Sequence, residues 1–196
     1  MKKIGSATLL SLVLLLCISC KQKKKGKPAN EQFLPVLSFI KSQVAQVDTS
    51  LNAIRKVVYV DSTRSDTFYY KREQFRELAS DFLRLPDIAS PDYDGRYKEE
   101  SQFDETLNSV ILTYLPVEPE KETIQRMQVM IPPDNQVGKI SSISIDYTVN
   151  SRDSSVLKRM LWQVDKSFQI TTIRQLPGQP ETTSTYKVIW NEEDNE

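Results

Sequence analysis

The sequence has no histidine, only two cysteines and only five glycines among its 196 residues. Histidine is the commonest general base and a frequent metal ligand, so its absence leaves any catalysis to Ser, Lys, Tyr, Asp or Glu. Glycines 95, 138 and 178 are isolated from one another, so no glycine-rich phosphate-binding loop is present. These shortages exclude most of the common catalytic and nucleotide-binding arrangements.

Positive and negative charges balance over the whole chain but not along it. There are 26 Lys plus Arg and 26 Asp plus Glu, whereas residues 1–27 contain seven lysines and no acid. The part from Pro28 onward therefore carries about seven net negative charges. An acidic domain repels phosphate, and the basic charge is confined to a short segment, so we expect no nucleic acid as a partner.

The first 20 residues have the pattern of an export signal. Lys2 and Lys3 precede an apolar run over residues 4–19, which is shorter than the roughly 20 residues of a membrane-spanning helix. The run ends in the letters LCISC at positions 16–20, and here the chain resembles bacterial lipoproteins, whose signal is cut just before a cysteine that then receives lipid. The resemblance implies that Cys20 carries the acyl chains, palmitate among them.

Two alternatives to lipidation stay open, namely soluble secretion and an uncleaved anchor. Cys17 is the poorer acceptor, because cleavage before it would put Leu16 where a small residue such as Ser19 is required. With Cys17 removed and Cys20 acylated, the mature chain has no free thiol and no disulfide. Its core must then be held by packing alone.

We predict four segments along the chain. Residues 1–19 are the lipoprotein signal peptide, and residues 20–30 are the lipidated Cys20 with a basic tether that suits anionic headgroups. Residues 31–191 form a single domain, and residues 192–196 are an acidic tail. Some surface-exported lipoproteins carry acidic residues after the cysteine, and the reverse charge here favours the periplasmic face. The expected location is the cell envelope, with the lipid anchor in the outer membrane.

The start of the domain has helical periodicity. Apolar residues spaced three and four apart predict a helix over residues 31–56, namely Phe33, Leu37, Ile40, Val44, Val47, Leu51 and Ile54. This helix packs on its own domain or, as the alternative, on a partner helix in a coiled coil. A second amphipathic helix is expected over residues 75–83, and residues 87–102 are expected to form the longest loop.

From residue 106 onward the apolar period changes to two. The predicted strands are 106–114, 123–131, 139–149, 156–165, 167–175 and 183–191, with prolines only between them. A short hairpin is expected from 57–60 and 67–70. The predicted fold class is α+β, with N-terminal amphipathic helices packed on an antiparallel β-meander.

No motif predicts a catalytic, cofactor-binding or metal-binding residue. The S-x-x-K pattern of penicillin-binding enzymes occurs at residues 38–41, 155–158 and 184–187, but K-T-G and S-D-N are absent. Residues 92–95 resemble a calcium loop, yet its first and twelfth positions are Ser90 and Ser101 rather than acids. Trp162 and Trp190 lie in predicted strands and indicate core positions, the alternative being a platform for a sugar or a partner.

The sequence therefore favours a non-catalytic envelope lipoprotein that is attached to the membrane through Cys20 and binds a macromolecular partner, for which a protein is one candidate, in a membrane assembly. The alternative function is a carrier of lipid or another apolar ligand, with a cavity between the sheet and the helices. No cofactor is expected.

Overall fold

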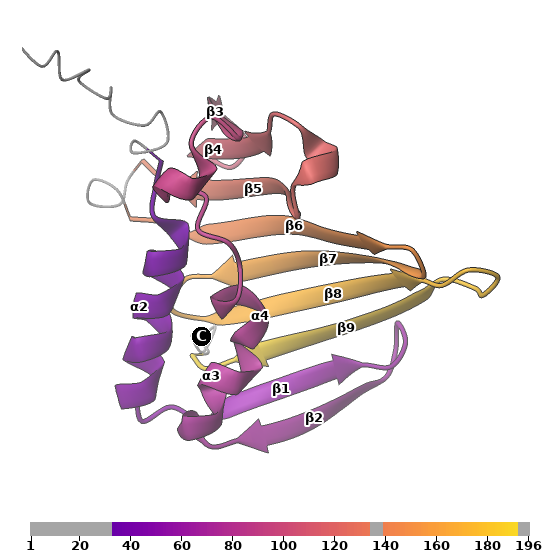
Figure 1. The fold of residues 1–196 in the computed structure, drawn as a ribbon. Helices are drawn as coiled ribbons and strands as arrows, with labels where there is room; N and C mark the ends of the chain where they lie inside the picture. Colours follow the sequence, from indigo (N-terminus) through magenta and orange to yellow (C-terminus); the bar gives the residue numbers. More distant parts are fainter. Residues whose placement is uncertain (1–32, 134–138, 192–196) are drawn as a thin grey trace, which may run out of the picture.

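The computed structural model describes residues 33–133 and 139–191, which form one antiparallel sheet with short helices on one face (Figure 1). The nine strands lie in the order β2-β1-β9-β8-β7-β6-β5-β4-β3. Their bounds are β1 Ile54–Tyr59, β2 Ser65–Tyr70, β3 Tyr97–Asp104, β4 Ser109–Pro116, β5 Ile124–Ile131, β6 Ser142–Ser151, β7 Ser154–Gln163, β8 Ser167–Gln175 and β9 Thr182–Ile189. The helices are α2 Val36–Thr49, α3 Phe75–Leu78 and α4 Ser80–Leu83, with 3-10 turns η3 Arg72–Gln74, η4 Pro91–Tyr93 and η5 Pro119–Lys121.

The predicted α+β fold with packed N-terminal amphipathic helices was wrong. The described chain is mainly a nine-stranded sheet. Its helices are short, with 14 residues in α2 and four each in α3 and α4. The error has two sources, a helix predicted too long and a strand taken for a loop. Residues 54–56, predicted as helix, belong to β1, and residues 97–102, predicted as loop, belong to β3.

The helix predicted over residues 31–56 ends at Thr49, so the second part of its apolar stripe does not belong to a helix. Leu51 is 97% exposed, and Ile54 is fully buried as the first residue of β1. Within α2 the buried stripe includes Val36, not the predicted Leu37. Among the described residues, no helix is long and apolar enough to cross a membrane.

The loop predicted over residues 87–102 contains the start of strand β3. Its sequence YKEESQFD shows no apolar alternation, because β3 is the last strand of the sheet and most of its side chains are exposed. The six strands predicted from residue 106 onward are confirmed, with ends displaced by no more than three residues. The predicted hairpin is also confirmed as β1 paired with β2.

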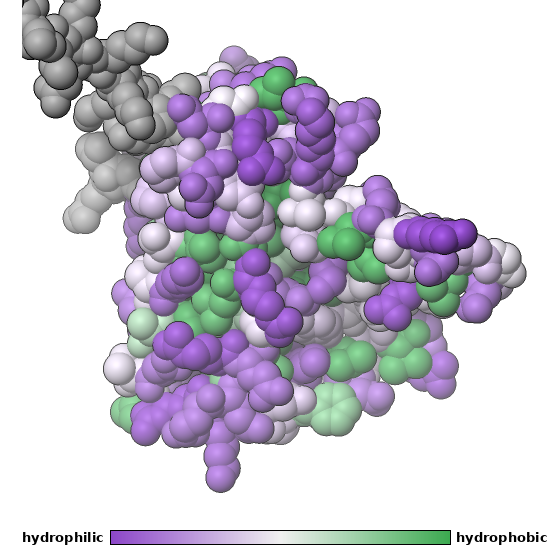
Figure 2. Space-filling view, viewed as in Figure 1, coloured by the Kyte–Doolittle hydropathy of each residue, from purple (hydrophilic) through white to green (hydrophobic). Residues whose placement is uncertain are grey.

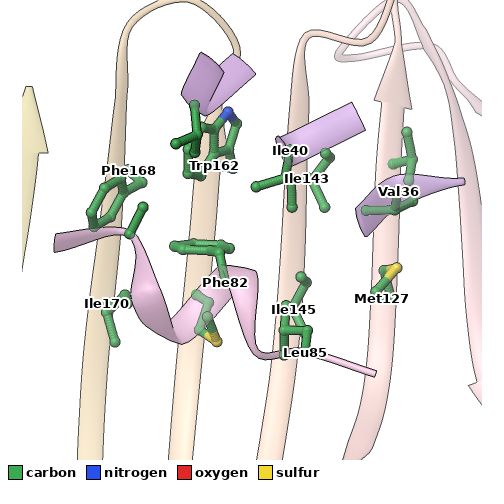
Figure 3. Close-up of a cluster of buried hydrophobic side chains, with 14 of the residues drawn as sticks. Val36, Ile40, Phe82, Leu85, Met127, Ile143, Ile145, Trp162, Phe168 and Ile170 are labelled. Atoms are coloured by element: carbon green, nitrogen blue, oxygen red, sulfur yellow. The ribbon is translucent and has the colours of Figure 1, made fainter. Parts of the chain in front are cut away.

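The core lies between the helices and one face of the sheet (Figure 3). Phe82 of α4 packs edge-on against Trp162 and Phe168, with ring centroids 5.1 and 5.3 Å apart. Trp162 and Phe168 are cross-strand neighbours that stack at 5.4 Å. Phe75 of α3 lies 5.0 Å from Trp190, so both short helices are attached to the sheet through aromatic rings.

A buried amide attaches α2 to the turn between β7 and β8. Gln43 is 6% exposed, and its Oε1 accepts a hydrogen bond of 3.0 Å from the backbone N–H of Asp165. Asp165 has a positive φ of 60°, a conformation that Asp adopts more readily than most residues in tight turns. The predicted Asp165-Lys166 connection is thus a turn, and α2 supplies its polar partner.

We expect Phe82→Ala to lower the free energy of unfolding by about 3–5 kcal/mol, because it removes the ring that packs edge-on against both Trp162 and Phe168 and leaves a cavity there. Leu51→Ala is the matched control, since Leu51 is 97% exposed and its truncation should change stability by less than about 0.5 kcal/mol. Urea unfolding followed by tryptophan fluorescence measures both values. Equal losses in the two variants would contradict this packing.

Candidate binding surfaces

The helices cover only one half of their face of the sheet. In Figure 1 strands β6 to β9 continue to the right beyond α4, and Figure 2, drawn from the same side, shows apolar and hydrophilic side chains next to each other there. A hollow of about 330 Å³ lies in this uncovered half, between the end of α4 and strands β6, β7 and β8. We refer to it as the β6–β8 hollow. Its volume is at the lower end of the range for small-molecule sites, about 300–1,000 Å³.

The strand register explains which side chains reach the β6–β8 hollow. Val149, Val156 and Arg174 lie opposite one another on three neighbouring strands and form one row across the sheet. The next row toward the helices contains Tyr147 and Lys158, again directly paired. These rows continue the face that carries the buried core, so the hollow begins where helical cover ends.

Charged groups on one side of the hollow come from distant parts of the chain. Lys158 Nζ lies 2.8 Å from Asp81 Oδ1, and the two side chains are 24% and 30% exposed. This ion pair joins α4 to β7. Arg84 and Arg174 also line the hollow, and neither has an ion-pair partner among the described residues. The hollow therefore contains three cationic groups and one carboxylate.

Tyr186 of β9 lies opposite Ile170 of β8, and the Asp81 carboxylate is close enough to act on its phenol. Burial of the phenol raises the pKa of Tyr186 to about 12, and the negative charge of Asp81 adds to the effect. Lys56 Nζ lies 4.4 Å from the centroid of the Tyr186 ring, a cation–π distance. Tyr186 is thus a neutral phenol at ordinary pH.

A second polar cluster forms around the buried carboxylate of Glu122. Arg96 donates two hydrogen bonds to it, from Nε at 2.7 Å and from Nη2 at 2.9 Å, and the Glu122 side chain is 5% exposed. The Tyr97 hydroxyl lies 3.2 Å from Glu122 Oε2 and from the carbonyl oxygen of Ile124. Burial raises the pKa of Tyr97 above its ordinary value. With its charge paired and its oxygens bonded, Glu122 has a structural role, linking the segment before β5 to Arg96 and to Tyr97 at the start of β3.

The two edges of the sheet differ in chemistry. Strand β3 at one edge, YKEESQFD, has four charged side chains, which is how natural sheets prevent pairing with another chain. Strand β2 at the other edge, SDTFYY, has a single charge and exposes Phe68 by 48% and Tyr69 by 75%. Edge β2 is therefore the less protected of the two.

The backbone of β2 also has hydrogen-bonding groups that point outward. The N–H of Val60 donates to the carbonyl of Arg64 at 3.0 Å, which makes this pair a hydrogen-bonded one. Hydrogen-bonded pairs alternate along an antiparallel ladder. The N–H and C=O groups of Ser65, Thr67 and Tyr69 accordingly point away from β1, toward the edge.

The structure separates the residues of the repeated S-x-x-K motif. In a strand, residues three apart point to opposite faces, so Ser155 and Lys158 cannot act together on β7, and the pair at residues 184 and 187 on β9 cannot either. Ser38 and Lys41 lie on the exposed side of α2. Trp162 and Trp190 are 0% and 5% exposed and belong to the core, not to a binding platform.

Cys20, the one predicted site residue, lies outside the described residues, as do the signal peptide, the tether and the acidic tail. Within residues 33–133 and 139–191, no three His, Cys, Asp or Glu side chains are grouped in a way that could hold a metal ion. Sequence reasoning missed the β6–β8 hollow, since its charged residues come from three separate segments.

Comparison with protein-family models, with curated proteins and with solved structures finds no match to this chain.

The raised pKa of Tyr186 predicts a loss of stability in alkali. An unfolded tyrosine titrates near pH 10, whereas folded Tyr186 titrates near 12, so the folded chain holds this proton more tightly. Its contribution is complete below pH 10 and disappears as the pH rises toward 12. We expect Tyr186→Phe to lose less stability over this interval than the wild type does.

Urea unfolding at a series of pH values measures this difference, and the ultraviolet absorbance of tyrosinate shows the titration directly. Asp81→Asn removes the nearby negative charge, so it should lower the pKa of Tyr186 from about 12 while keeping the phenol. An alkaline slope that is identical in the wild type and in Tyr186→Phe would argue against the assignment.

Proposed function

We propose that this chain is a lipid-anchored protein of the bacterial cell envelope that binds a partner protein and does not catalyse a reaction. The anchor is Cys20, preceded by the signal-like run over residues 4–19 and followed by the basic tether. The folded domain faces the periplasm. The absence of histidine and of a free thiol after acylation supports a binding role over a catalytic one.

The observation that carries the partner-binding proposal is the unprotected edge of β2. An extended segment of a partner adds to the sheet as a tenth strand and bonds to the outward backbone groups of Ser65, Thr67 and Tyr69. Phe68 and Tyr69 project from opposite faces of β2, so they contact side chains on both faces of the added strand. Main-chain bonds supply affinity, and these two aromatic residues supply selectivity.

The alternative function, carriage of a lipid or another apolar ligand, is favoured by the β6–β8 hollow alone. The space under α3 and α4 is filled by aromatic rings in mutual contact, with centroids 5.0–6.4 Å apart. A carried ligand would therefore lie in the uncovered half of the face and not under the helices. Partner binding remains the first proposal, because β2 offers both backbone groups and exposed aromatic side chains.

The anchor is tested by substituting its acceptor. In cells fed with labelled palmitate, we expect Cys20→Ser to lose the label and to leave the washed membrane fraction, because no acyl chain then holds it there. Cys17→Ser is the matched control and should keep both the label and the membrane location. Labelled protein in the Cys20→Ser strain would rule out this acceptor.

The partner surface is tested by photocrosslinking in the native cells. A photoreactive phenylalanine analogue at position 69 should give a discrete adduct with one protein, identified by mass spectrometry, whereas the same analogue at Gln102 on β3 should give none. Thr67→Pro should abolish the adduct at position 69, because proline has no N–H to donate and the Thr67 N–H points away from β1.

Circular dichroism of Thr67→Pro checks that the sheet is retained. Adducts of equal yield from both edges, or an adduct that survives Thr67→Pro, would refute strand addition at β2. An adduct of twice the chain's own mass would identify a second copy as the occupant and would likewise contradict a separate partner protein.

A further inference from the structure

We propose that the β6–β8 hollow binds one amphipathic anion, a lipid-like molecule with a carboxylate or phosphate head and an aliphatic chain. Three features point to this chemistry: two arginines, Arg84 and Arg174, that have no ion-pair partner among the described residues, an apolar wall beside them, and a volume of about 330 Å³. The inference rests on the alternative function proposed for this hollow and not on strand addition at β2, which uses an edge of the sheet rather than this face.

The charge of the hollow is opposite to that of the domain around it. From Pro28 onward the chain carries about seven net negative charges, yet Arg84, Arg174 and Lys158 meet here against the single carboxylate of Asp81. Asp81 already pairs with Lys158 at 2.8 Å, so the two guanidinium groups are left to bind a ligand. Guanidinium donors match the geometry of a carboxylate or phosphate in a bidentate contact.

The apolar side of the hollow indicates a chain attached to that head. Val149 is 40% exposed and lies opposite Val156, while Leu85 and Met160 form the buried floor. A site for a bare anion has no need of this wall, whereas an aliphatic chain laid along it removes apolar surface from water on both sides.

The register gives the ligand a direction in the hollow. Arg174 lies opposite Val156 at the open end, and Met160 lies two rows nearer the helices. The head is placed at Arg174 and Arg84, and the chain lies along Val149 and Val156, in the uncovered half of the face. Asp81 repels a second negative charge, which favours a singly charged head over a more highly charged one.

Calorimetric titration of the full chain carrying Cys20→Ser tests the site, because that variant has no acyl chain on Cys20 to compete. The probe is dodecanoate below its micelle concentration, and we expect saturable binding of one molecule per chain. Dodecyltrimethylammonium has the same chain with a cationic head, and butyrate and inorganic phosphate have the head with little or no chain. All three should bind at least about tenfold more weakly.

The residues are tested by paired variants. The double variant Arg84→Gln with Arg174→Gln should weaken dodecanoate binding by at least about tenfold, because it removes both charge-assisted contacts. Arg159→Gln is the matched control, since Arg159 is exposed on the opposite face of β7, and it should bind as the unsubstituted chain does. Val156→Asp should also abolish binding by putting a carboxylate in the apolar wall.

Thermal unfolding checks that each variant stays folded, and Thr67→Pro should bind dodecanoate normally, which separates this site from β2. Equal binding of the cationic amphiphile, or unchanged affinity in the arginine double variant, would overturn the proposal. Binding of inorganic phosphate as tight as that of dodecanoate would reduce the hollow to a simple anion site and would overturn the lipid-like ligand.

Discussion

Phe75 and Phe82 attach the short helices to the sheet, and this contact determines which part of the sheet remains open. Both rings pack against Trp162 and Phe168, which are cross-strand neighbours on β7 and β8. Helices of four residues have little stability of their own, so their positions depend on this tertiary contact. Because the aromatic cluster lies at one end of the strands, the other end of the same face stays uncovered.

The β6–β8 hollow follows from that off-centre cover. The end of α4 brings Asp81 and Arg84 to the border between the closed and open halves, where Lys158 already projects from β7. One ion pair then fixes α4 against the sheet, and the remaining cations face the open half. An apolar face that would be core under a longer helix becomes the wall of a hollow lined with positive charge.

The two edges show a comparable division of roles. Strand β3 carries four charged side chains and exposed polar groups, and the residue before it, Arg96, pairs with the buried carboxylate of Glu122. Strand β2 has a single charge and, among the described residues, no such pair, and it exposes two aromatic residues. An open sheet with one protected and one unprotected edge has a defined side for an incoming strand.

Residue periodicity was informative where one face of an element is buried. The alternation in Ile143, Ile145 and Tyr147 predicted a strand correctly, because the buried face selects apolar side chains at every second position. It failed for β3, since an exposed edge strand imposes no such selection. It also failed at Leu51 and Ile54, where helical spacing continued by coincidence beyond the end of α2.

Local sequence by itself determined the strands of the meander, their turns, the uneven distribution of charge and the signal-like first segment, because each depends on neighbouring residues. Only the tertiary structure decided that residues 97–104 form the last strand of the sheet, that α2 stops at Thr49, and that Asp81, Lys158 and Arg174 line the same hollow. These three residues come from separate segments, and Asp81 and Lys158 alone are 77 positions apart. Their meeting depends on how the aromatic core orients α4, and no local pattern contains that information.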